Sequence, residues 1–266
     1  MNYEEIFAQR GGDYDRAMRE YAHARDEEFR LPLQLAGIRP GEVVTDVPAG
    51  GGYLARYLPP GCQWHGHEPC ADFTGGGQER NQALLPLPWP DGLADLAVSI
   101  AGVHHLQDKR PLLRELRRVI KPQGRLMLAD VHEGSAVAHF LDGFVGDNNS
   151  TGHVGRYLGL HTLEDLRASG WNIVQAQRIT YPWRFDSQES LGRFCHQLFD
   201  LRRCGWEETL RAAREGPGVT HQEEVWQLNW ELYFILAEPA LSTPVAGQEE
   251  SNAAATPSRA GSTPRY

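Results

Sequence analysis

A glycine cluster between two acidic residues is the part of this chain best suited to chemistry. The β-branched residues before Asp46 predict a strand, the glycine run 50–52 predicts a tight turn, and residues 53–58 are compatible with a helix. In such a unit the glycines let the backbone approach a ligand at the helix N-terminus. Glu68 closes the next predicted strand, 22 residues after Asp46, which is about the spacing of a carboxylate that holds a ribose hydroxyl. Together these features indicate a nucleoside-containing cofactor better than the glycine run does alone.

Three further motifs follow in order along the chain. They are L-P-W-P-D-G at 87–92, H-H-L at 104–106 and E-L-R-R-V-I-K-P-Q-G at 115–124. This order resembles class I S-adenosylmethionine-dependent methyltransferases, in particular the small-molecule group that includes the ubiquinone/menaquinone-biosynthesis C-methyltransferases. That group shows L-P-F-P-D-G-x-F-D-x-V, then H-H-L, then E-x-x-R-V-L-K-P-G-G-x-L. The resemblance covers residues 42–131, about a third of the chain, and says little about the methyl acceptor.

The resemblance implies which residues bind the donor, S-adenosylmethionine. The loop after the first strand would surround its methionine end, Glu68 would bind the ribose, and the residues at the end of the predicted strand 93–100 would line the pocket. The cofactor-binding residues expected on this basis are Asp46, Ala49, Gly50, Gly52, Glu68, Ala83, Leu84, Ser99, Ile100 and Ala101. Two positions depart from the family pattern. Pro48 replaces the usual first glycine and removes a backbone donor, and Ala83 stands where family members often have an acid that binds the adenine amino group.

Histidines supply the candidate groups for catalysis. His104 and His105 resemble the H-H-L motif at the mouth of the site, and His132 follows the strand that ends in Asp130. Neutral imidazole could take a proton from the acceptor, but a histidine at a helix start can equally serve only to bond the backbone. Because positioning alone can supply much of the barrier reduction for methyl transfer, a base is optional. The expected acceptor contacts are Tyr14, His139, His153 and Tyr157.

The segment 62–70 has a spacing that zinc sites also show. Its possible ligands are Cys62, His65, His67 and Cys70. The segment is predicted as a strand, in which His65 and His67 share one face, and Glu68 is already assigned to the ribose. We therefore expect no metal site in this protein.

Composition narrows the class of protein. The net charge is −9 with no stretch rich in lysine and arginine, so nucleic acid is not an expected partner. No apolar run approaches the ~18 residues of a membrane span, and the first residues lack the features of a signal peptide. Four cysteines do not make a disulfide framework for a chain of 266 residues, so reduced thiols and a cytoplasmic location are expected.

Strand and helix patterns alternate through the middle of the chain. Strands are predicted at 42–47, 62–68, 93–100 and 124–131, with helices at 51–58 and 109–120. Such alternation predicts a parallel sheet with helices on both faces. Later elements are a helix with Thr162 as N-cap, a strand at 173–179, helices within 187–214, and a last strand at 232–237 that the resemblance implies to be antiparallel.

The predicted fold is an α/β, Rossmann-like, seven-stranded, mostly parallel sheet with a helical lid. We divide the chain into an N-terminal helical lid segment (1–40), a class I methyltransferase domain (41–238) with a helical insertion (187–225), and a disordered tail (239–266). The predicted function is methyl transfer to O, N or C of a small-molecule acceptor. The alternatives are a fold that binds the donor without turnover, as a scaffold or regulatory subunit, and a protein methyltransferase. An NAD-type oxidoreductase fits less well, because the motifs at 87–92 and 115–124 have no role there.

Overall fold

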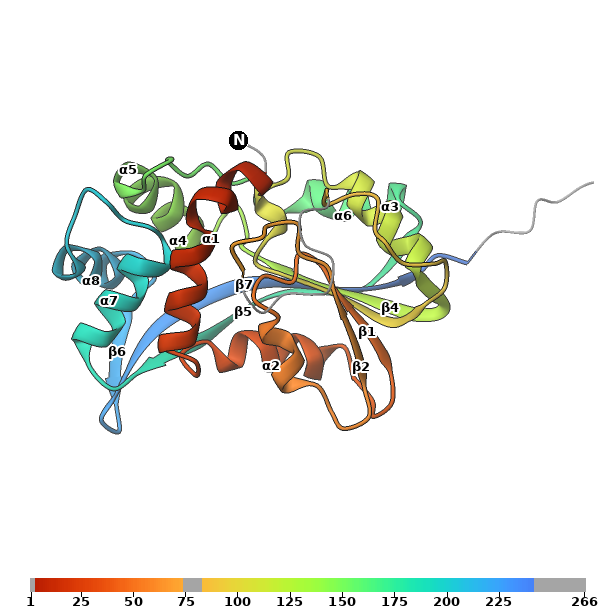
Figure 1. Ribbon diagram of the computed structural model, residues 1–266, viewed down its shortest axis with the longest axis horizontal. Coiled ribbons are helices and arrows are strands. Elements are labelled where there is room, and N and C mark those ends of the chain that lie inside the picture. The colour runs from red at the N-terminus through yellow and green to blue at the C-terminus, as the bar shows by residue number, and fades with distance from the viewer. Residues whose placement is uncertain (1–2, 74–82, 242–266) are drawn as a thin grey trace, which may run out of the picture.

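A seven-stranded sheet forms the centre of the molecule in the computed structural model, which describes residues 3–73 and 83–241 (Figure 1). The strands are β1 (Val43–Asp46), β2 (Gln63–Gly66), β3 (Ala94–Ile100), β4 (Ile120–Asp130), β5 (Trp171–Phe185), β6 (Val219–Gln222) and β7 (Val225–Pro239). Their order is β2-β1-β3-β4-β7-β5, and β6 pairs with β7. β7 is antiparallel to each of its neighbours, whereas the other pairs are parallel. Six strands therefore share one direction, which confirms the predicted mostly parallel sheet with an antiparallel last strand.

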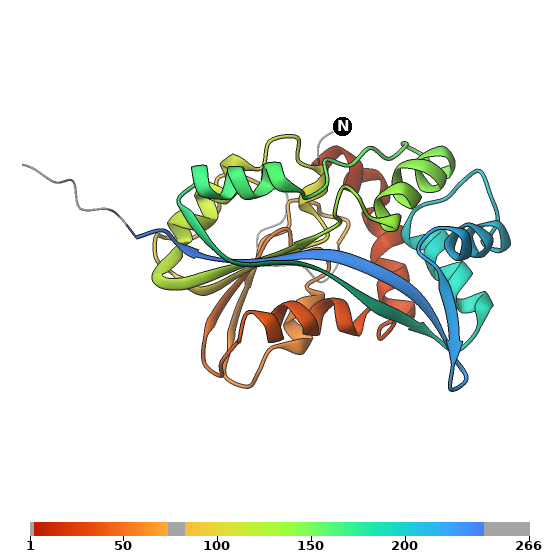
Figure 2. The ribbon, with the colours of Figure 1, turned by 180° about the vertical axis from the view of Figure 1, so that it is seen from behind.

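Helices cover both faces of this sheet, as predicted. The α-helices are α1 (Tyr3–Glu20), α2 (Asp26–Leu35), α3 (Arg110–Val119), α4 (Ala136–Phe140), α5 (Gly146–Asn148), α6 (Leu160–Ala168), α7 (Gln188–Leu198) and α8 (Trp206–Glu215). α3 and α6 lie on one face and α2 on the other (Figure 2). In α3 the buried residues Leu112, Leu116 and Val119 recur at helical spacing, so one apolar stripe meets the sheet.

The glycine loop leads into a shorter helix than the sequence predicts. Instead of an α-helix over 51–58, the structure has one 3₁₀ segment, η1 (Tyr53–Tyr57). Pro59 explains the early end, because a residue that precedes proline is driven out of the helical region. Leu58 accordingly has extended backbone angles, φ −72° and ψ 140°.

The C-terminal part of the domain differs from the prediction in three ways. The helices within 187–214 are two separate elements, α7 and α8, and the end of the predicted helical insertion forms β6 and the start of β7. β7 is therefore much longer than the predicted strand 232–237. The prediction that Thr162 is an N-cap was wrong: Gly159 is the N-cap of α6, and the Thr162 hydroxyl accepts a hydrogen bond from the Gly159 N–H at 3.2 Å.

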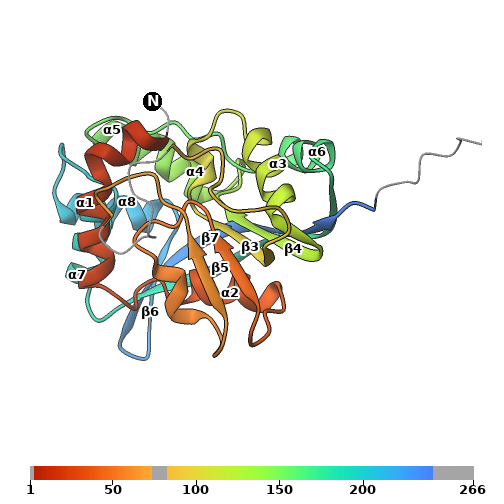
Figure 3. The ribbon, with the colours of Figure 1, turned by 45° about the vertical axis from the view of Figure 1, so that its right-hand side comes forward.

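Strands β5 and β7 extend beyond the parallel part of the sheet and meet α7 and α8 (Figures 1 and 3). Aromatic residues hold this extension together: the rings of Trp183 on β5 and Trp230 on β7 stack with centroids 4.1 Å apart. Helix α1 packs against α7 and carries Tyr3 and Phe7 onto Cys70 and Phe73, near the glycine loop. The expected disordered tail lies outside the described residues from position 242 onward.

Candidate active site

Two adjoining cavities lie where the parallel strands end. The first, here called the glycine-loop cavity, is lined by the glycine loop, the start of α1 and the loop after β3. The second, the histidine cavity, is lined by the histidines that follow β3 and by aromatic residues of β5, α7 and β7. Phe7, Tyr14, Arg25 and Ala101 line both cavities, so the two are neighbours.

Backbone geometry explains the glycines of the loop. Gly50 and Gly52 have φ values of 52° and 75°, in the left-handed region that other residues rarely enter. Gly52 is also the N-cap of η1. The tight turn brings Ala49 and Gly50 to the cavity wall beside Pro48, as the resemblance implied.

The carboxyl group of Asp46 stands at the end of β1 and lines the glycine-loop cavity. Burial raises its pKa to about 8, with a smaller contribution from the neighbouring Glu68, and a hydrogen bond from the Trp64 Nε1 at 3.3 Å works in the opposite direction. A buried acid without a cation beside it is costly, so this group is suited to receive a ligand that brings positive charge or hydrogen-bond donors.

Glu68 receives three hydrogen bonds from the protein itself. Its Oε2 accepts from the Tyr3 hydroxyl at 2.8 Å and from the Gly50 N–H at 2.9 Å, while its Oε1 accepts from the Cys70 N–H at 2.8 Å. Burial raises the pKa of this carboxyl despite these donors. The Tyr3 hydroxyl thus bonds the carboxylate that the sequence analysis predicts to bind a ribose.

Helix α1 fills much of the glycine-loop cavity. The remaining space is about 40 Å³, far below the roughly 300–1,000 Å³ of cavities that hold larger small molecules. A nucleoside-containing ligand can therefore enter only if the start of α1, with Tyr3 and Phe7, moves outward.

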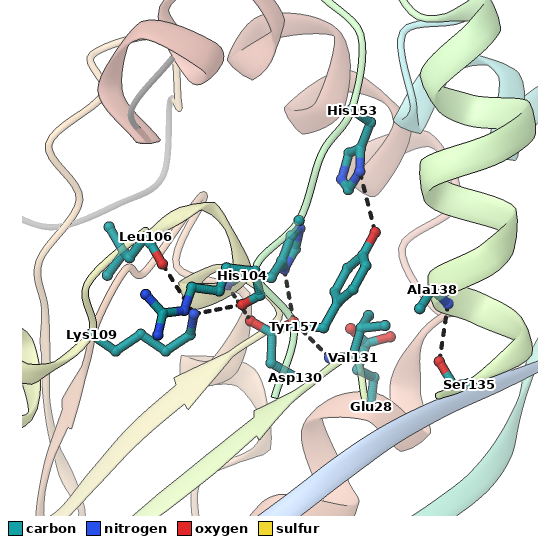
Figure 4. A network of polar contacts seen from close by, with 12 residues as sticks. Glu28, His104, Leu106, Lys109, Asp130, Val131, Ser135, Ala138, His153 and Tyr157 are labelled. Carbon is teal, nitrogen blue, oxygen red and sulfur yellow. Dashed lines mark hydrogen bonds and ion pairs between the residues drawn. The ribbon is translucent and has the colours of Figure 1, made fainter. Parts of the chain in front are cut away.

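His104 is held by a carboxylate at the wall of the histidine cavity. Its Nδ1 lies 2.7 Å from Asp130 Oδ1, and its backbone N–H donates to Asp130 Oδ2 at 3.0 Å (Figure 4). Burial alone would raise the pKa of Asp130, but attraction to His104 and these hydrogen bonds bring it below its ordinary value. Asp130 is therefore an ionised acceptor, and the Nδ1 of His104 donates a hydrogen bond to it.

His153 is paired with a carboxylate in the same way as His104. Its Nδ1 lies 3.2 Å from Asp142 Oδ1, which also accepts from the Tyr157 hydroxyl at 2.5 Å. Figure 4 shows Tyr157 beside both His104 and His153. Burial opposes ionisation of Asp142, but the two hydrogen bonds lower its pKa. Tyr157 itself is buried outside the cavity lining and supports the histidines from behind.

His105 lies between these two histidines and α1. Its ring centroid is 4.0 Å from that of His104 and 5.5 Å from that of His153, and Phe7 packs edge-on against it at 5.4 Å. Burial, with repulsion from the neighbouring histidines, lowers its pKa well below the ordinary value. The imidazole of His105 is therefore neutral.

A buried ion pair that the sequence did not reveal supports the other end of the histidine cavity. The Arg25 guanidinium bonds Glu28, and its charge lies 4.9 Å from the centre of the Trp183 ring. Glu28 also accepts from Trp183 Nε1 at 2.8 Å. Arg25 and Glu28 are three positions apart on charged segments that look solvent-exposed in the sequence, so no local signal distinguished them.

Several predicted site residues lie elsewhere. Ser99 is fully buried within β3, and neither Ser99 nor Gly52 lines the glycine-loop cavity or the histidine cavity. Ala83 and Leu84 bond other parts of the chain: His67 Nε2 lies 3.1 Å from the Ala83 carbonyl oxygen, and the Leu84 N–H donates to Glu4. These backbone groups are engaged already, which argues against the predicted adenine contacts.

Two predicted histidines need correction. His132 accepts a hydrogen bond from the Gly134 N–H and packs against Tyr233, outside both cavities. His139 is exposed on α4, where its Nδ1 lies 2.8 Å from the Ser135 carbonyl oxygen. Neither side chain lines the glycine-loop cavity or the histidine cavity in this structure.

Comparisons with known proteins agree with this geometry. A family model described as a methyltransferase domain matches residues 45–128, from β1 to β4, and includes the glycine loop and the η2 segment (Val103–His105). This part, about a third of the chain, is therefore similar to a methyltransferase domain. Within the described residues, no helix combines the length and the apolar character needed to cross a membrane.

Curated relatives of this methyltransferase domain differ in what they act on. The ubiquinone/menaquinone biosynthesis C-methyltransferase UbiE of Hydrogenovibrio crunogenus is 30% identical over 118 residues, which cover 38% of this chain and 46% of that protein. The match thus spans about half the length of that relative. The malonyl-(acyl-carrier protein) O-methyltransferase of a Marinomonas species is 28% identical and is covered to 83%, as is this chain.

Solved structures show the same fold at low identity. The YcgJ protein of Bacillus subtilis aligns with a TM-score of 0.56 and 17% identity over 82% of this chain and 100% of its own. Phosphoethanolamine N-methyltransferase 2 of Haemonchus contortus, solved with S-adenosylhomocysteine, aligns with a TM-score of 0.59 and 12% identity over 91% of this chain and 61% of its own. At these identities the likeness concerns the fold alone.

Proposed function

We propose that this chain transfers a methyl group from S-adenosylmethionine to a small-molecule acceptor. The observation that carries the proposal is a cavity lined by Asp46 and a left-handed glycine loop, with Glu68 bonded to its wall residues Tyr3 and Gly50, directly beside a second cavity lined by histidines and aromatic rings. The first cavity has the groups that a nucleoside and a charged amino-acid end require. The second lies where an acceptor would meet the methyl group.

Specific residues around the glycine-loop cavity would hold each part of the donor. Glu68 would accept the ribose hydroxyls once the Tyr3 hydroxyl has left it. Asp46 would face the positive charge of the donor's amino-acid end or sulfonium, which favours the ionised form of this acid. The glycine loop would lie along the methionine part, and Ile100 and Ala101 would border the adenosine.

The acceptor would lie in the histidine cavity, in line with the donor's methyl group. Its walls include Trp183, Phe199 and Trp230 together with Arg10 and the histidines. This composition suits a planar, partly apolar acceptor that carries an oxygen or nitrogen nucleophile. Holding donor and acceptor in line can itself supply roughly 7–11 kcal/mol of barrier reduction.

One observation favours the alternative of a donor-binding fold without methyl-transfer activity. The glycine-loop cavity is closed by α1, and Tyr3 occupies the ribose carboxylate. A chain that never opened this cavity would act as a scaffold or regulatory subunit.

Calorimetry with three ligands separates the proposal from its alternatives. We expect S-adenosylmethionine and S-adenosylhomocysteine to bind and NAD to show no heat of binding. A methyl-labelled donor, incubated with quinols, phenols and acyl-thioester acids, then tests turnover by mass spectrometry. Binding without labelled product from any acceptor class would support the regulatory alternative, and binding of NAD alone would overturn the methyltransferase reading.

A further inference from the structure

Three histidines converge in the histidine cavity from two distant parts of the chain. His104 and His105 belong to η2, after β3, and His153 belongs to the loop before α6. Each is less than a tenth exposed. One ring nitrogen from each histidine can be chosen so that the three nitrogens all lie within 4.8 Å of one another.

Two of these histidines are oriented by carboxylates on the far side of the ring. Asp130 bonds the Nδ1 of His104 (Figure 4). Asp142 bonds the Nδ1 of His153. Histidines that bind metals typically donate their second N–H to a carboxylate in this way, which fixes the ring and makes the free nitrogen more basic. No described residue hydrogen-bonds a ring nitrogen of His105, so its lone pair is available.

We propose that His104, His105 and His153 bind one divalent transition-metal ion, with Zn²⁺ the best match. Three imidazole ligands and an open fourth position are the donor set of several zinc sites. Imidazole also suits Fe, Ni and Cu, whereas Mg²⁺ and Ca²⁺ require oxygen ligands that are not in this first sphere.

The rings need only a small adjustment to hold the ion. At zinc–nitrogen distances of about 2.0–2.1 Å, tetrahedral ligand atoms stand about 3.3 Å apart. The nitrogens must therefore approach one another by at most ~1.5 Å from their present separation. Because η2 and the loop that carries His153 are short irregular segments, side-chain rotations suffice for this movement.

An opening leads from solvent to the proposed site. A hollow of about 200 Å³ on the outer side is lined by His105, His153 and Arg10 with residues 151–154. His105, His153 and Arg10 also line the histidine cavity, so the metal site would separate the outer hollow from the acceptor side. A metal ion can thus enter without passing through the glycine-loop cavity.

Charged groups of both signs surround the proposed site. Asp130 and Asp142 offset the ion from behind two of its ligands, while Lys109 donates to the carbonyl oxygens of Leu106 and Arg156 and is thereby directed at backbone. Arg10 lines the histidine cavity and the outer hollow. A positive group at that place favours an anionic oxygen at the fourth position, so a deprotonated hydroxyl or a carboxylate of the acceptor would complete the sphere.

This inference goes beyond the proposed function and does not rest on it, because metal binding is measured without a methyl donor. The full chain, prepared without a histidine tag and stripped with a chelator, is titrated with Co²⁺. We expect one Co²⁺ per chain, the strong visible absorption of a four-coordinate ion, and its loss when Zn²⁺ is added.

Variants distinguish the proposed site from adventitious binding. His153→Gln removes a ligand, and Asp142→Asn removes the carboxylate behind it. Each should weaken Co²⁺ binding by roughly 10–100-fold or more. His139→Gln, which changes an exposed histidine on α4, should bind Co²⁺ as the unaltered chain does.

Circular dichroism and the thermal unfolding transition show which variants are folded. If His153→Gln is misfolded, Asp142→Asn carries the test, because Asp142 is 43% exposed and its loss leaves the cavity walls in place. Absence of a four-coordinate spectrum in the unaltered chain would overturn the proposal. An equal loss of affinity in His139→Gln and His153→Gln would overturn it as well.

Discussion

The glycine-loop cavity and the histidine cavity share a wall but are built in different ways. The first takes Asp46 and its glycine loop from one short stretch, residues 46–53, and α1 and the loop after β3 close it. The second draws on α1, η2, the loop before α6, α7 and the strands β5 and β7. The acid and the glycine loop of the first are therefore encoded locally, whereas the walls of the second come together only when the whole domain has folded.

This difference predicts whether a substitution will change ligand affinity or the stability of the fold. A change in the glycine-loop cavity should alter ligand affinity and leave the fold intact, because the carboxylates there cost stability. A change beneath the histidine cavity should weaken the fold, because its walls are joined by buried charges and stacked rings.

The largest effect is expected from Glu28→Ala. This change leaves the buried Arg25 guanidinium without its partner and removes the acceptor of the Trp183 N–H. Breaking a buried pair in this way costs about 3–5 kcal/mol, which chemical denaturation measures. The control is Glu27→Ala, whose half-exposed contact to Arg184 should be worth about 0–1 kcal/mol. Equal losses in the two variants would show that the ion pair has no special role.

Asp46→Asn should stabilise the unliganded protein, and more so at higher pH. The folded pKa of Asp46 is about 8, whereas the unfolded value is about 3.9. Between these values the unfolded state releases the proton that the folded state keeps, so stability falls as pH rises. Asparagine removes this penalty, and the gain at pH 8 should exceed the gain at pH 5 by about 3–4 kcal/mol. Denaturation at both pH values measures the difference, and a gain independent of pH would contradict the burial of a protonated Asp46.

Glu68→Ala should weaken donor binding with little effect on the histidine cavity. Loss of a hydrogen bond to a charged group costs roughly 1.5–3 kcal/mol, which calorimetry with S-adenosylhomocysteine measures. Glu164→Ala, an exposed site on α6, provides the control. An unchanged dissociation constant in Glu68→Ala would remove Glu68 from the ribose role.

The smallest effect is expected from Tyr3→Phe, and it has the opposite sign. The Tyr3 hydroxyl competes with a ribose for Glu68, so its removal should tighten donor binding by about 0.5–1.5 kcal/mol, the value of one ordinary hydrogen bond. Tyr233→Phe on β7, outside the cavities, should leave affinity unchanged. If Tyr3→Phe weakens binding, the hydroxyl must contact the donor itself.

The sequence revealed the local features and missed those that depend on distant contacts. Alternating strands and helices, the glycine loop and Glu68 were visible because each is encoded within a few residues. His153 was predicted as an acceptor contact, but its approach to His104 joins segments 49 positions apart, and no local pattern encodes it. The start of β7 was missed because Val225 was assigned to the helical insertion 187–225 and the alternation of Trp226, Leu228 and Trp230 just after it was not recognised.

The central claim is that S-adenosylmethionine binds in the glycine-loop cavity with its reactive end toward the histidines. A crystal structure of the chain with S-adenosylhomocysteine tests this claim most directly. We expect the ribose hydroxyls on Glu68, the Tyr3 hydroxyl displaced from that carboxylate, and the sulfur facing His104 and His105. Ligand bound in the separate hollow between α1 and α7, or a Tyr3–Glu68 bond that persists in the complex, would contradict the account.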